Sequence, residues 1–181
     1  MMIPVVSPDR VRREKGFTLI EMIVVVAIIA SLAAILVPIV SSELADAEST
    51  KAVGDCQRIA AAVTQFIKDT RLFPTGPLGN NSVNWLYGDG TQPSTNPFDD
   101  GASATLTSYL TAGTTNGGQL WNGPYVQEVN ADPWGNCYIV NVHGYYSGEY
   151  VWVLSSGPNG AFDTDQTDTA LQGDDIGIMI D

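Results

Sequence analysis

The longest hydrophobic run covers residues 17–40, and its polar residues are Thr18, Glu21 and Ser31. As a helix it would be about 36 Å long, enough to cross a bilayer with some tilt. It is longer than the roughly 7–15 apolar residues of a cleaved secretory signal, so we interpret it as a membrane-spanning helix. Four basic residues precede it and predict a cytoplasmic N-terminus, with the C-terminal part outside the inner membrane: Arg10, Arg12, Arg13 and Lys15.

Beyond residue 40 the pattern becomes that of an amphipathic helix, with apolar residues at three- and four-residue steps. Pro74 disfavours continuation of the helix. We therefore predict one long helix, with residues 17–40 in the membrane and residues 41–75 forming its amphipathic part, ending near Asp69. The apolar positions of the second half are Val53, Cys56, Ile59, Ala60, Val63, Phe66 and Ile67.

The remaining residues indicate a small β-sheet and long loops. Residues 138–142 and 150–154 alternate and are rich in β-branched and aromatic side chains, which predicts two strands joined by the turn "HGYYSG". Residues 76–120 are rich in Gly, Asn, Thr, Ser and Pro, which predicts a loop-rich region, with a short helix or strand at "TLTSYL". Residues 121–181 would hold the sheet and an acidic C-terminal loop. The predicted fold class is α+β.

Charge is distributed unevenly along the chain. The net charge is −12, and the residues after Gly16 hold 4 basic and 18 acidic side chains. Such a domain is a poor partner for nucleic acid and a better one for divalent cations. The single histidine, His143, lies in a predicted turn, and "SSG" lacks the G-x-S-x-G context of a nucleophile. The sequence therefore argues against an enzyme.

Glu21 lies near the cytoplasmic end of the apolar run. Inserting a carboxylate into the membrane costs free energy. A positively charged partner at the same depth in the membrane would offset that cost. Cleavage after Gly16 would leave an α-ammonium group on Phe17, four residues from Glu21. The new amine of a neighbouring subunit would then pair with Glu21 in a medium of low dielectric constant.

The stretch "KGFTLIE", followed by about twenty apolar residues, closely resembles the assembly signal of type IV pilins and type II secretion pseudopilins. The resemblance implies a leader peptide, residues 1–16, that a prepilin peptidase removes by cutting after Gly16. It implies N-methylation of Phe17 and pairing of Glu21 with a neighbour's N-terminus. Pro38 matches the proline within the apolar helix of that family. The implied fold is type IV pilin-like, with a long N-terminal helix packed on a small antiparallel sheet and a long loop-rich insertion.

The C-terminal stretch "SSGPNGAFDTDQTDTALQGDDIGIMID" concentrates carboxylates on a Gly-rich loop. Oxygen ligands at short spacing suit Ca²⁺, although the spacing is not that of an EF-hand. A solvated acidic loop is the alternative. The five carboxylates are Asp163, Asp165, Asp168, Asp174 and Asp175.

The segments "GPYV", "DPWGN" and "SSGPNG…DDIG" closely resemble those of the major pseudopilins of type II secretion, including their calcium loop. Asn159 replaces the aspartate of that family's turn. The insertion of residues 162–172 is longer than the family's loop. Two alternatives follow: one of its carboxylates replaces the charge that is missing at Asn159, or the loop is merely solvated. The resemblance implies calcium ligands at Ser156, Asn159, Ala161, Asp174 and Asp175, with Asp163, Asp165 and Asp168 as candidate additions.

The two cysteines, Cys56 and Cys137, lack the spacing of a zinc site. Cys56 lies on the apolar face of the predicted helix, which favours a buried thiol. A disulfide with Cys137 would need a geometry that the sequence does not fix. Both alternatives remain open at this point.

The resemblance implies a structural subunit of a periplasmic pseudopilus, anchored in the bacterial inner membrane before assembly. Its implied partners are other copies of itself, minor pseudopilins, the prepilin peptidase and an inner-membrane assembly platform. A type IV pilin of a surface fibre is one alternative. A membrane-anchored, calcium-dependent binding module is another.

Overall fold

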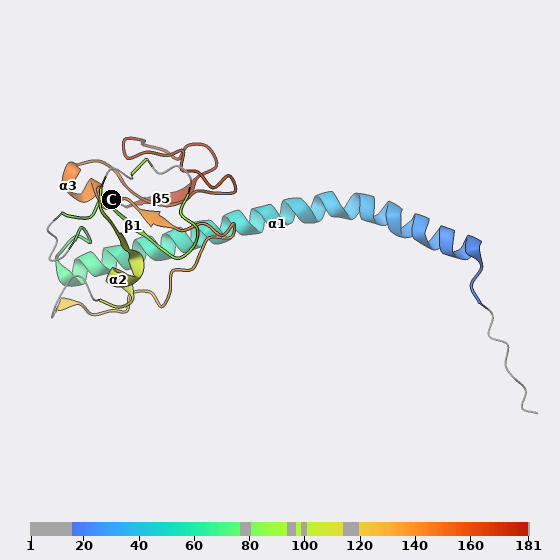
Figure 1. Cartoon of the computed structure of the whole chain (residues 1–181), viewed down its shortest axis with the longest axis horizontal. Helices are drawn as coiled ribbons and strands as arrows, with labels where there is room; N and C mark the ends of the chain where they lie inside the picture. The colour runs from blue at the N-terminus through green and yellow to red at the C-terminus, as the bar shows by residue number, and fades with distance from the viewer. Residues whose placement is uncertain (1–15, 77–80, 94–96, 99–100, 114–119, 181) are drawn as a thin grey trace, which may run out of the picture. The chain divides into compact units, whose positions relative to one another are not determined.

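The computed structural model describes residues 16–76, 81–93, 97–98, 101–113 and 120–180. It divides into two compact units, residues 1–43 and 44–181. Of the predicted leader, residues 1–15 lie outside the described residues, as do parts of the predicted loop-rich region. Figure 1 shows the helix α1, Leu19–Thr70, and the sheet and loops of the second unit.

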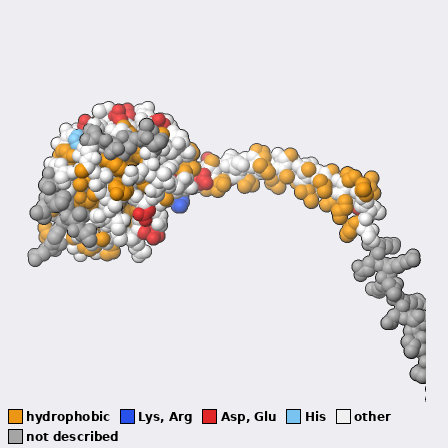
Figure 2. Space-filling view, in the orientation of Figure 1, with side chains coloured by type: hydrophobic (Ala, Val, Ile, Leu, Met, Phe, Trp, Pro, Cys, Tyr) orange, Lys and Arg blue, Asp and Glu red, His pale blue; other side chains and the backbone are white. Residues whose placement is uncertain are grey.

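The part of α1 in the first unit is apolar and exposed. Its side chains are almost all hydrophobic, as the orange surface in Figure 2 shows. Among the described residues, α1 is the one helix long and apolar enough to cross a membrane, with a mean hydropathy of 3.1 in its most apolar window. Pro38 lies inside the helix. An apolar surface of this extent needs lipid or protein to cover it.

The part of α1 in the second unit is amphipathic, as predicted. Its apolar face enters a core cluster with residues of the sheet, among them Leu86, Val140 and Val153. The helix ends at Thr70, whose Oγ1 donates to Phe66 O at 2.7 Å. The buried helix residues are Ala52, Cys56, Ile59, Ala60, Ala62, Val63, Phe66 and Thr70.

Polar contacts also attach α1 to the rest of the second unit. Arg58 Nη1 donates to Glu128 O at 3.0 Å, and Arg58 Nη2 pairs with Asp55 at 3.1 Å. The other carboxylate oxygen of Asp55 accepts from the Tyr138 hydroxyl at 3.2 Å. These contacts fix the helix relative to the strand region beside Tyr138.

The second unit contains a five-stranded sheet in the order β2-β1-β3-β4-β5. Three of its neighbouring pairs are antiparallel, and β1 with β2 is parallel. The type IV pilin-like α+β prediction is confirmed, but the sheet is mixed rather than wholly antiparallel. The strands are β1 Trp85–Tyr87, β2 Ser103–Thr105, β3 Ile139–Val140, β4 Val151–Ser155 and β5 Ile176–Ile180.

Several local predictions need correction. The strand expected at residues 138–142 is only the two-residue β3, and the turn after it contains a short helix, α3, Gly144–Ser147. The region predicted to be loop-rich also contributes the strands β1 and β2, whereas its helix α2, Leu106–Leu110, lies at "TLTSYL", where a short helix or strand was predicted. The acidic tail ends in β5, which pairs with β4 over five residues. The chain end therefore has its own place in the sheet.

The two faces of the sheet are covered by two hydrophobic clusters. Val140 and Val153 belong to the cluster that contains the α1 residues. Ile139 and Leu154, their neighbours along the strands, belong to a second cluster with Trp85, Phe98 and Phe162. This alternation is the pattern of a sheet buried on both sides.

Candidate functional site

The N-terminal candidate site is the first turn of α1. Thr18 is the residue before the helix, and its backbone N–H and its hydroxyl both donate to Glu21 Oε2 at 2.7 Å. The Glu21 N–H in turn donates to Thr18 Oγ1 at 3.3 Å. This reciprocal arrangement is a capping box, in which two unpaired backbone donors of the helix start are satisfied. Glu21 therefore has a local role that our sequence interpretation missed, although T-x-x-E is its signature.

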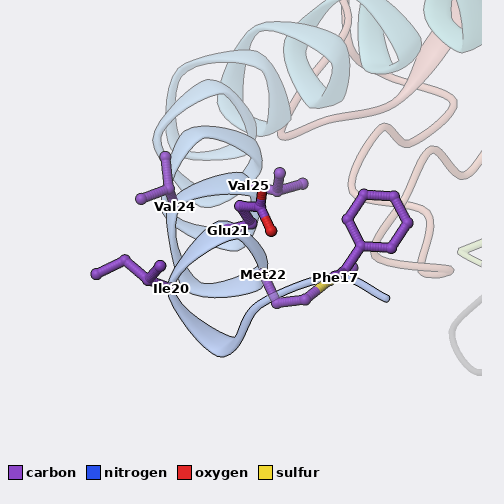
Figure 3. Close-up of a pocket in the computed structure, with 6 residues that line it drawn as sticks. All are labelled: Phe17, Ile20, Glu21, Met22, Val24 and Val25. Carbon is purple, nitrogen blue, oxygen red and sulfur yellow. The ribbon is translucent and has the colours of Figure 1, made fainter. Parts of the chain in front are cut away.

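Glu21 and Phe17 both line an open pocket on the surface of the helix start. Figure 3 shows Ile20 and Val24 on one side of the helix, away from the Glu21 carboxylate. Phe17 and Gly16 are exposed before the helix begins. The carboxylate is thus the acidic group in an otherwise apolar, uncovered surface. The pocket is lined by Phe17, Ile20, Glu21, Met22, Val24 and Val25.

The C-terminal candidate site is formed where the turn after β4 meets the segment before β5. Gly157 has a φ of +60°, and a Cβ atom built there would lie 2.3 Å from the backbone oxygen of Asp174. Only glycine permits both the left-handed backbone and this close approach. Asn159 N–H also donates to Asp174 Oδ2 at 3.0 Å. The two segments predicted to share a cation therefore lie in direct contact.

Asp175 is the most buried carboxylate of this loop, with 6% of its surface exposed. Its Oδ2 accepts from the backbone N–H groups of Asp163 and Thr164, at 2.9 and 2.7 Å. Its Oδ1 is buried and has no hydrogen-bond partner among the described residues. Burial raises the pKa of Asp175 above its ordinary value, and the hydrogen bonds to the carboxylate offset only part of that effect.

The other predicted ligands are distributed around this carboxylate. Ser156 is buried, and its Oγ has no partner among the described residues. Asn159 Oδ1 accepts from Ala161 N–H at 2.6 Å, which closes the turn. The Asn159 side chain thus also shapes the turn.

The inserted residues 162–172 are packed against the sheet at several points. Phe162 is buried in the second hydrophobic cluster. The buried Thr164 accepts from Gln172 N–H at 3.0 Å, and Trp152 Nε1 donates to Asp168 O at 3.3 Å. The insertion is therefore an ordered part of the domain, with solvent-facing carboxylates on a fixed backbone.

The donor chemistry of the loop fits Ca²⁺, although the geometry is not that of a closed site. Among the described residues, no group of three or more His, Cys, Asp or Glu side chains is arranged to hold a metal ion. The unpartnered Oδ1 of Asp175 and Oγ of Ser156 are oxygen atoms, as calcium prefers. Residues 72–181 contain twelve acidic residues and no Lys or Arg. These residues therefore offer Asp175 no Lys or Arg side chain as a positive partner.

The cysteines do not form a disulfide. Both are buried free thiols. Cys56 belongs to the cluster on the α1 face of the sheet, whereas Cys137 belongs to the cluster on the opposite face. Burial raises the pKa of Cys56 to about 12 and that of Cys137 to about 11, so both are protonated at neutral pH. Of the two alternatives left open, the structure has the buried thiols.

The exposed apolar helix with its capped glutamate, joined to a small sheet domain, defines the class of type IV pilin-like subunits. The profile described as the prokaryotic N-terminal methylation motif matches residues 11–37. The profile of type II secretion system protein G matches residues 101–174. This second match includes most of the acidic loop.

Individual proteins of known identity agree with these two matches. The type II secretion system core protein G of Pseudomonas aeruginosa is 33% identical over 128 residues, covering 70% of this chain and 72% of that protein. That of Escherichia coli is 29% identical over 156 residues, covering 84% and 88%. That of Dickeya chrysanthemi is 27% identical over 166 residues, covering 92% and 86%. No solved structure matched the chain.

The chain belongs to the family of type II secretion system core protein G, the major pseudopilins. Membership of this family makes it a pseudopilin subunit of a type II secretion system. The apolar N-terminal helix is consistent with anchoring in the inner membrane.

Proposed function

We propose that this protein is the building block of a periplasmic pseudopilus, and that it assembles through the first turn of α1 after a prepilin peptidase has removed residues 1–16. The observation that carries the proposal is Glu21, an acidic residue at the head of a helix whose apolar side chains are exposed. In the membrane this surface faces lipid. In a filament it would face the same surface of other copies.

Glu21 has two separable roles in this proposal. Within one chain it caps α1 through Thr18, for which an oxygen acceptor suffices. Between chains its negative charge pairs with the α-ammonium group that cleavage creates on Phe17 of a neighbour. Cleavage and charge pairing are therefore linked, because an uncleaved chain has a peptide nitrogen, without charge, at that position.

Two substitutions distinguish the roles of Glu21. Glu21→Gln keeps an acceptor for Thr18 and removes the charge, whereas Glu21→Ala removes both. The full chain would be expressed with the peptidase and assembly proteins of its secretion system, and sheared filaments measured by immunoblot. We expect both variants to reach the membrane fraction and both to lose filaments. Normal filament yield from Glu21→Gln would show that assembly needs the cap and not the charge.

We further propose that the C-terminal loop binds Ca²⁺ and that the ion stabilises the subunit. Asp174 and Asp175 would supply carboxylate oxygens, and the turn of Ser156, Asn159 and Ala161 would supply further oxygen donors. Support comes from the buried, unpartnered Oδ1 of Asp175 and from the contact between the two segments. Because β5 already pairs with β4, the ion would tighten the loop and not attach the chain end.

Thermal unfolding of the full chain in detergent tests calcium binding. Binding to the folded state alone adds about 2.7 kcal/mol when free calcium is a hundred times the dissociation constant. We expect a higher melting temperature in calcium than in chelator, and a weaker effect of magnesium, which demands stricter octahedral geometry. Asp175→Asn should remove most of the difference. Equal melting temperatures in calcium and chelator would leave the solvated loop as the correct interpretation.

A further inference from the structure

Asn159 and Gly160 form an Asn-Gly pair in the turn after β4. In such a pair the backbone nitrogen of the glycine can attack the amide carbon of the asparagine side chain, because glycine has no side chain that hinders the approach. The described residues contain a second pair of this kind, Asn122 and Gly123. Both asparagines are exposed, so that water reaches both. The two pairs differ in their contacts.

The side chain of Asn159 is folded back along the peptide that follows it. Its Oδ1 accepts from the Ala161 N–H at 2.6 Å, which is the contact of an Asx turn. In this conformation the amide carbon of Asn159 lies along the peptide that joins it to Gly160, whose nitrogen is the nucleophile. The Gly160 N–H has no acceptor among the described residues. No hydrogen bond from this part of the chain therefore holds the nitrogen away from the amide carbon.

Each polar end of the Asn159 amide is bound by a group that suits this attack. The Ala161 N–H stabilises the negative charge that Oδ1 acquires when the amide carbon is attacked. The carboxylate of Asp163 accepts from Nδ2 at 3.2 Å, and Nδ2 is the leaving nitrogen. A carboxylate in this position can pass on the proton with which that nitrogen leaves as ammonia.

The backbone is anchored before the pair and has room at Gly160. The Asn159 N–H donates to Asp174 Oδ2 at 3.0 Å. Gly160 has a φ of +71°, and the nearest atoms to an added Cβ belong to Asn136, at 3.7 Å. The glycine is therefore not packed tightly against a neighbouring segment, and the turn can adjust while a ring closes.

Asn122 lacks these contacts. Its backbone N–H donates to the Tyr125 hydroxyl at 3.0 Å, but its side chain makes no hydrogen bond with the described residues. A Cβ atom built at Gly123 would lie 2.4 Å from the ring of Trp121, so this glycine is closely packed. Asn122 is thus an internal control, with the same dipeptide and a similar exposure.

We propose that Asn159 loses its side-chain amide in the folded protein, through a cyclic imide with Gly160, and becomes aspartate or isoaspartate. The Gly160 nitrogen gives up its proton and bonds to Cγ of Asn159. The bond between Cγ and Nδ2 then breaks, and Nδ2 leaves as ammonia with one proton more. Water opens the ring at either carbonyl group. The net reaction consumes one water and releases one ammonia, and nothing is oxidised or reduced.

Both products change the turn where it meets the segment before β5. Aspartate places a second negative charge beside Asp163, at a position where an amide N–H is now the donor. Isoaspartate adds a carbon atom to the backbone next to the N–H that binds Asp174. The turn should therefore loosen, while the five-residue pairing of β4 with β5 remains.

Incubation of the purified full chain in detergent, at mildly alkaline pH with chelator present, tests this proposal apart from any effect of calcium. Mass spectrometry of chymotryptic peptides follows the replacement of NH2 by OH at each asparagine, and enzymatic methylation detects isoaspartate. We expect about tenfold more product at Asn159 than at Asn122, less than the hundredfold or more that an oxyanion donor contributes in a water-excluded active site. In the same chain unfolded in urea, the two rates should become similar.

Two variants that remove the same charge test the part of Asp163. Asp163→Asn keeps an oxygen acceptor for Asn159 and removes the carboxylate, so the reaction at Asn159 should slow several-fold. The carboxylate of Asp165 binds Thr167 instead, so Asp165→Asn should leave the rate unchanged. Asn159→Gln should abolish the reaction at this position, because the longer side chain moves the amide carbon away from the Gly160 nitrogen.

Equal product at Asn159 and Asn122 in the folded chain, or a faster reaction at Asn159 in urea than in the folded chain, would overturn the proposal. An unchanged rate in Asp163→Asn, with the far-ultraviolet circular dichroism of the wild type, would overturn the part assigned to Asp163. Should that variant fold poorly, the comparison of folded and urea-unfolded wild type still decides, since it needs no substitution.

Discussion

Ser155 Oγ donates a hydrogen bond of 2.6 Å to Asp132 Oδ2, and both side chains are buried. The second oxygen of Asp132 accepts from the N–H groups of Trp134 and Asn136, at 3.0 and 2.8 Å. Ser155 Oγ also accepts from Gly157 N–H at 3.2 Å. One buried carboxylate therefore joins the "DPWGN" turn to the start of the candidate calcium turn.

Removing this carboxylate should destabilise the whole second unit. Asp132→Ala leaves two backbone N–H groups and the Ser155 hydroxyl without their acceptor, which should cost about 2–4 kcal/mol of unfolding free energy. Urea unfolding of the full chain in detergent, with chelator present, measures this loss without any contribution from calcium. Asp89→Ala, at an exposed aspartate, is the matched control and should stay within about 0.5 kcal/mol of the wild type. Similar losses in both variants would contradict the structural role of Asp132.

A comparison of Gly157 with Gly135 separates two costs of adding a side chain. One is the strain of a left-handed backbone, and the other is the clash with the backbone of Asp174. Both glycines have positive φ, +60° and +89°, but an added Cβ meets Asp174 O at Gly157 and nothing within 4 Å at Gly135. Gly135→Ala should cost about 1–2 kcal/mol from backbone strain. Gly157→Ala should cost about 1–3 kcal/mol more, because the backbone of Asp174 must move. Equal unfolding free energies for the two variants would show that the segments are not held together.

The elements with strong periodicity were predictable. The helix was predicted to end near Asp69 and ends at Thr70, since the apolar steps are regular and Pro74 follows soon after. Residues 150–154 were predicted as a strand and β4 is Val151–Ser155, because a run of β-branched and aromatic residues is a clear local signal. These elements are specified largely by their own residues.

The elements that depend on tertiary pairing were missed. Trp85–Tyr87 is only three residues long and stands among Gly and Asn, yet it pairs with β2 and β3 in the interior of the sheet. Ile176–Ile180 follows a dense group of carboxylates and contains Gly177, which weakens a strand signal. Neither segment has enough local preference to be recognised without its neighbours.

The kinds of residue that form the candidate sites could be predicted from the sequence. The contacts that these residues make with one another could not. The acidic loop was visible in the sequence, but only the folded turn shows Asp163 beside Asn159 and Asp165 beside Thr167. The capping role of Glu21 was present in the T-x-x-E spacing and was overlooked because the surrounding residues are apolar. Asp132 begins the "DPWGN" segment, and its link to Ser155 spans residues far apart in the chain.

Intact-mass measurement of the chain extracted from membranes tests the predicted processing. The mature protein should begin at Phe17 and carry one methyl group, because the matched methylation motif spans residues 11–37 and Gly16 is exposed before the helix. Gly16→Ala places a side chain where nothing lies within 4 Å, so an effect on processing would reflect recognition and not folding. A mature chain that begins at Met1 in cells containing the peptidase would rule out cleavage at this bond.

Asp175 should make the stability of the calcium-free protein depend on pH. Because burial raises its pKa in the folded state, the folded chain binds more protons than the unfolded chain between the ordinary value of 3.8 and the raised one. The contribution of Asp175 to the free energy of unfolding therefore falls as the pH rises through that window. At neutral pH the folded protein is still destabilised by the ionised carboxylate. In chelator, we expect the melting temperature to rise when the pH is lowered from 7 towards the raised pKa.

Bound calcium should abolish the gain in melting temperature on acidification, and a neutral side chain at position 175 should weaken it. A bound cation stabilises the ionised carboxylate, so in calcium the gain on acidification should disappear. Asp175→Asn keeps the shape of the group without its charge, and in chelator at pH 7 it should melt at or above the wild-type temperature, with a weaker response to pH. Asp168→Asn, which removes a charge from the same loop, should keep the wild-type response. If Asp175→Asn melted lower than the wild type in chelator at pH 7, the buried carboxylate would be stabilising without a cation, and the reason for placing one beside it would be lost.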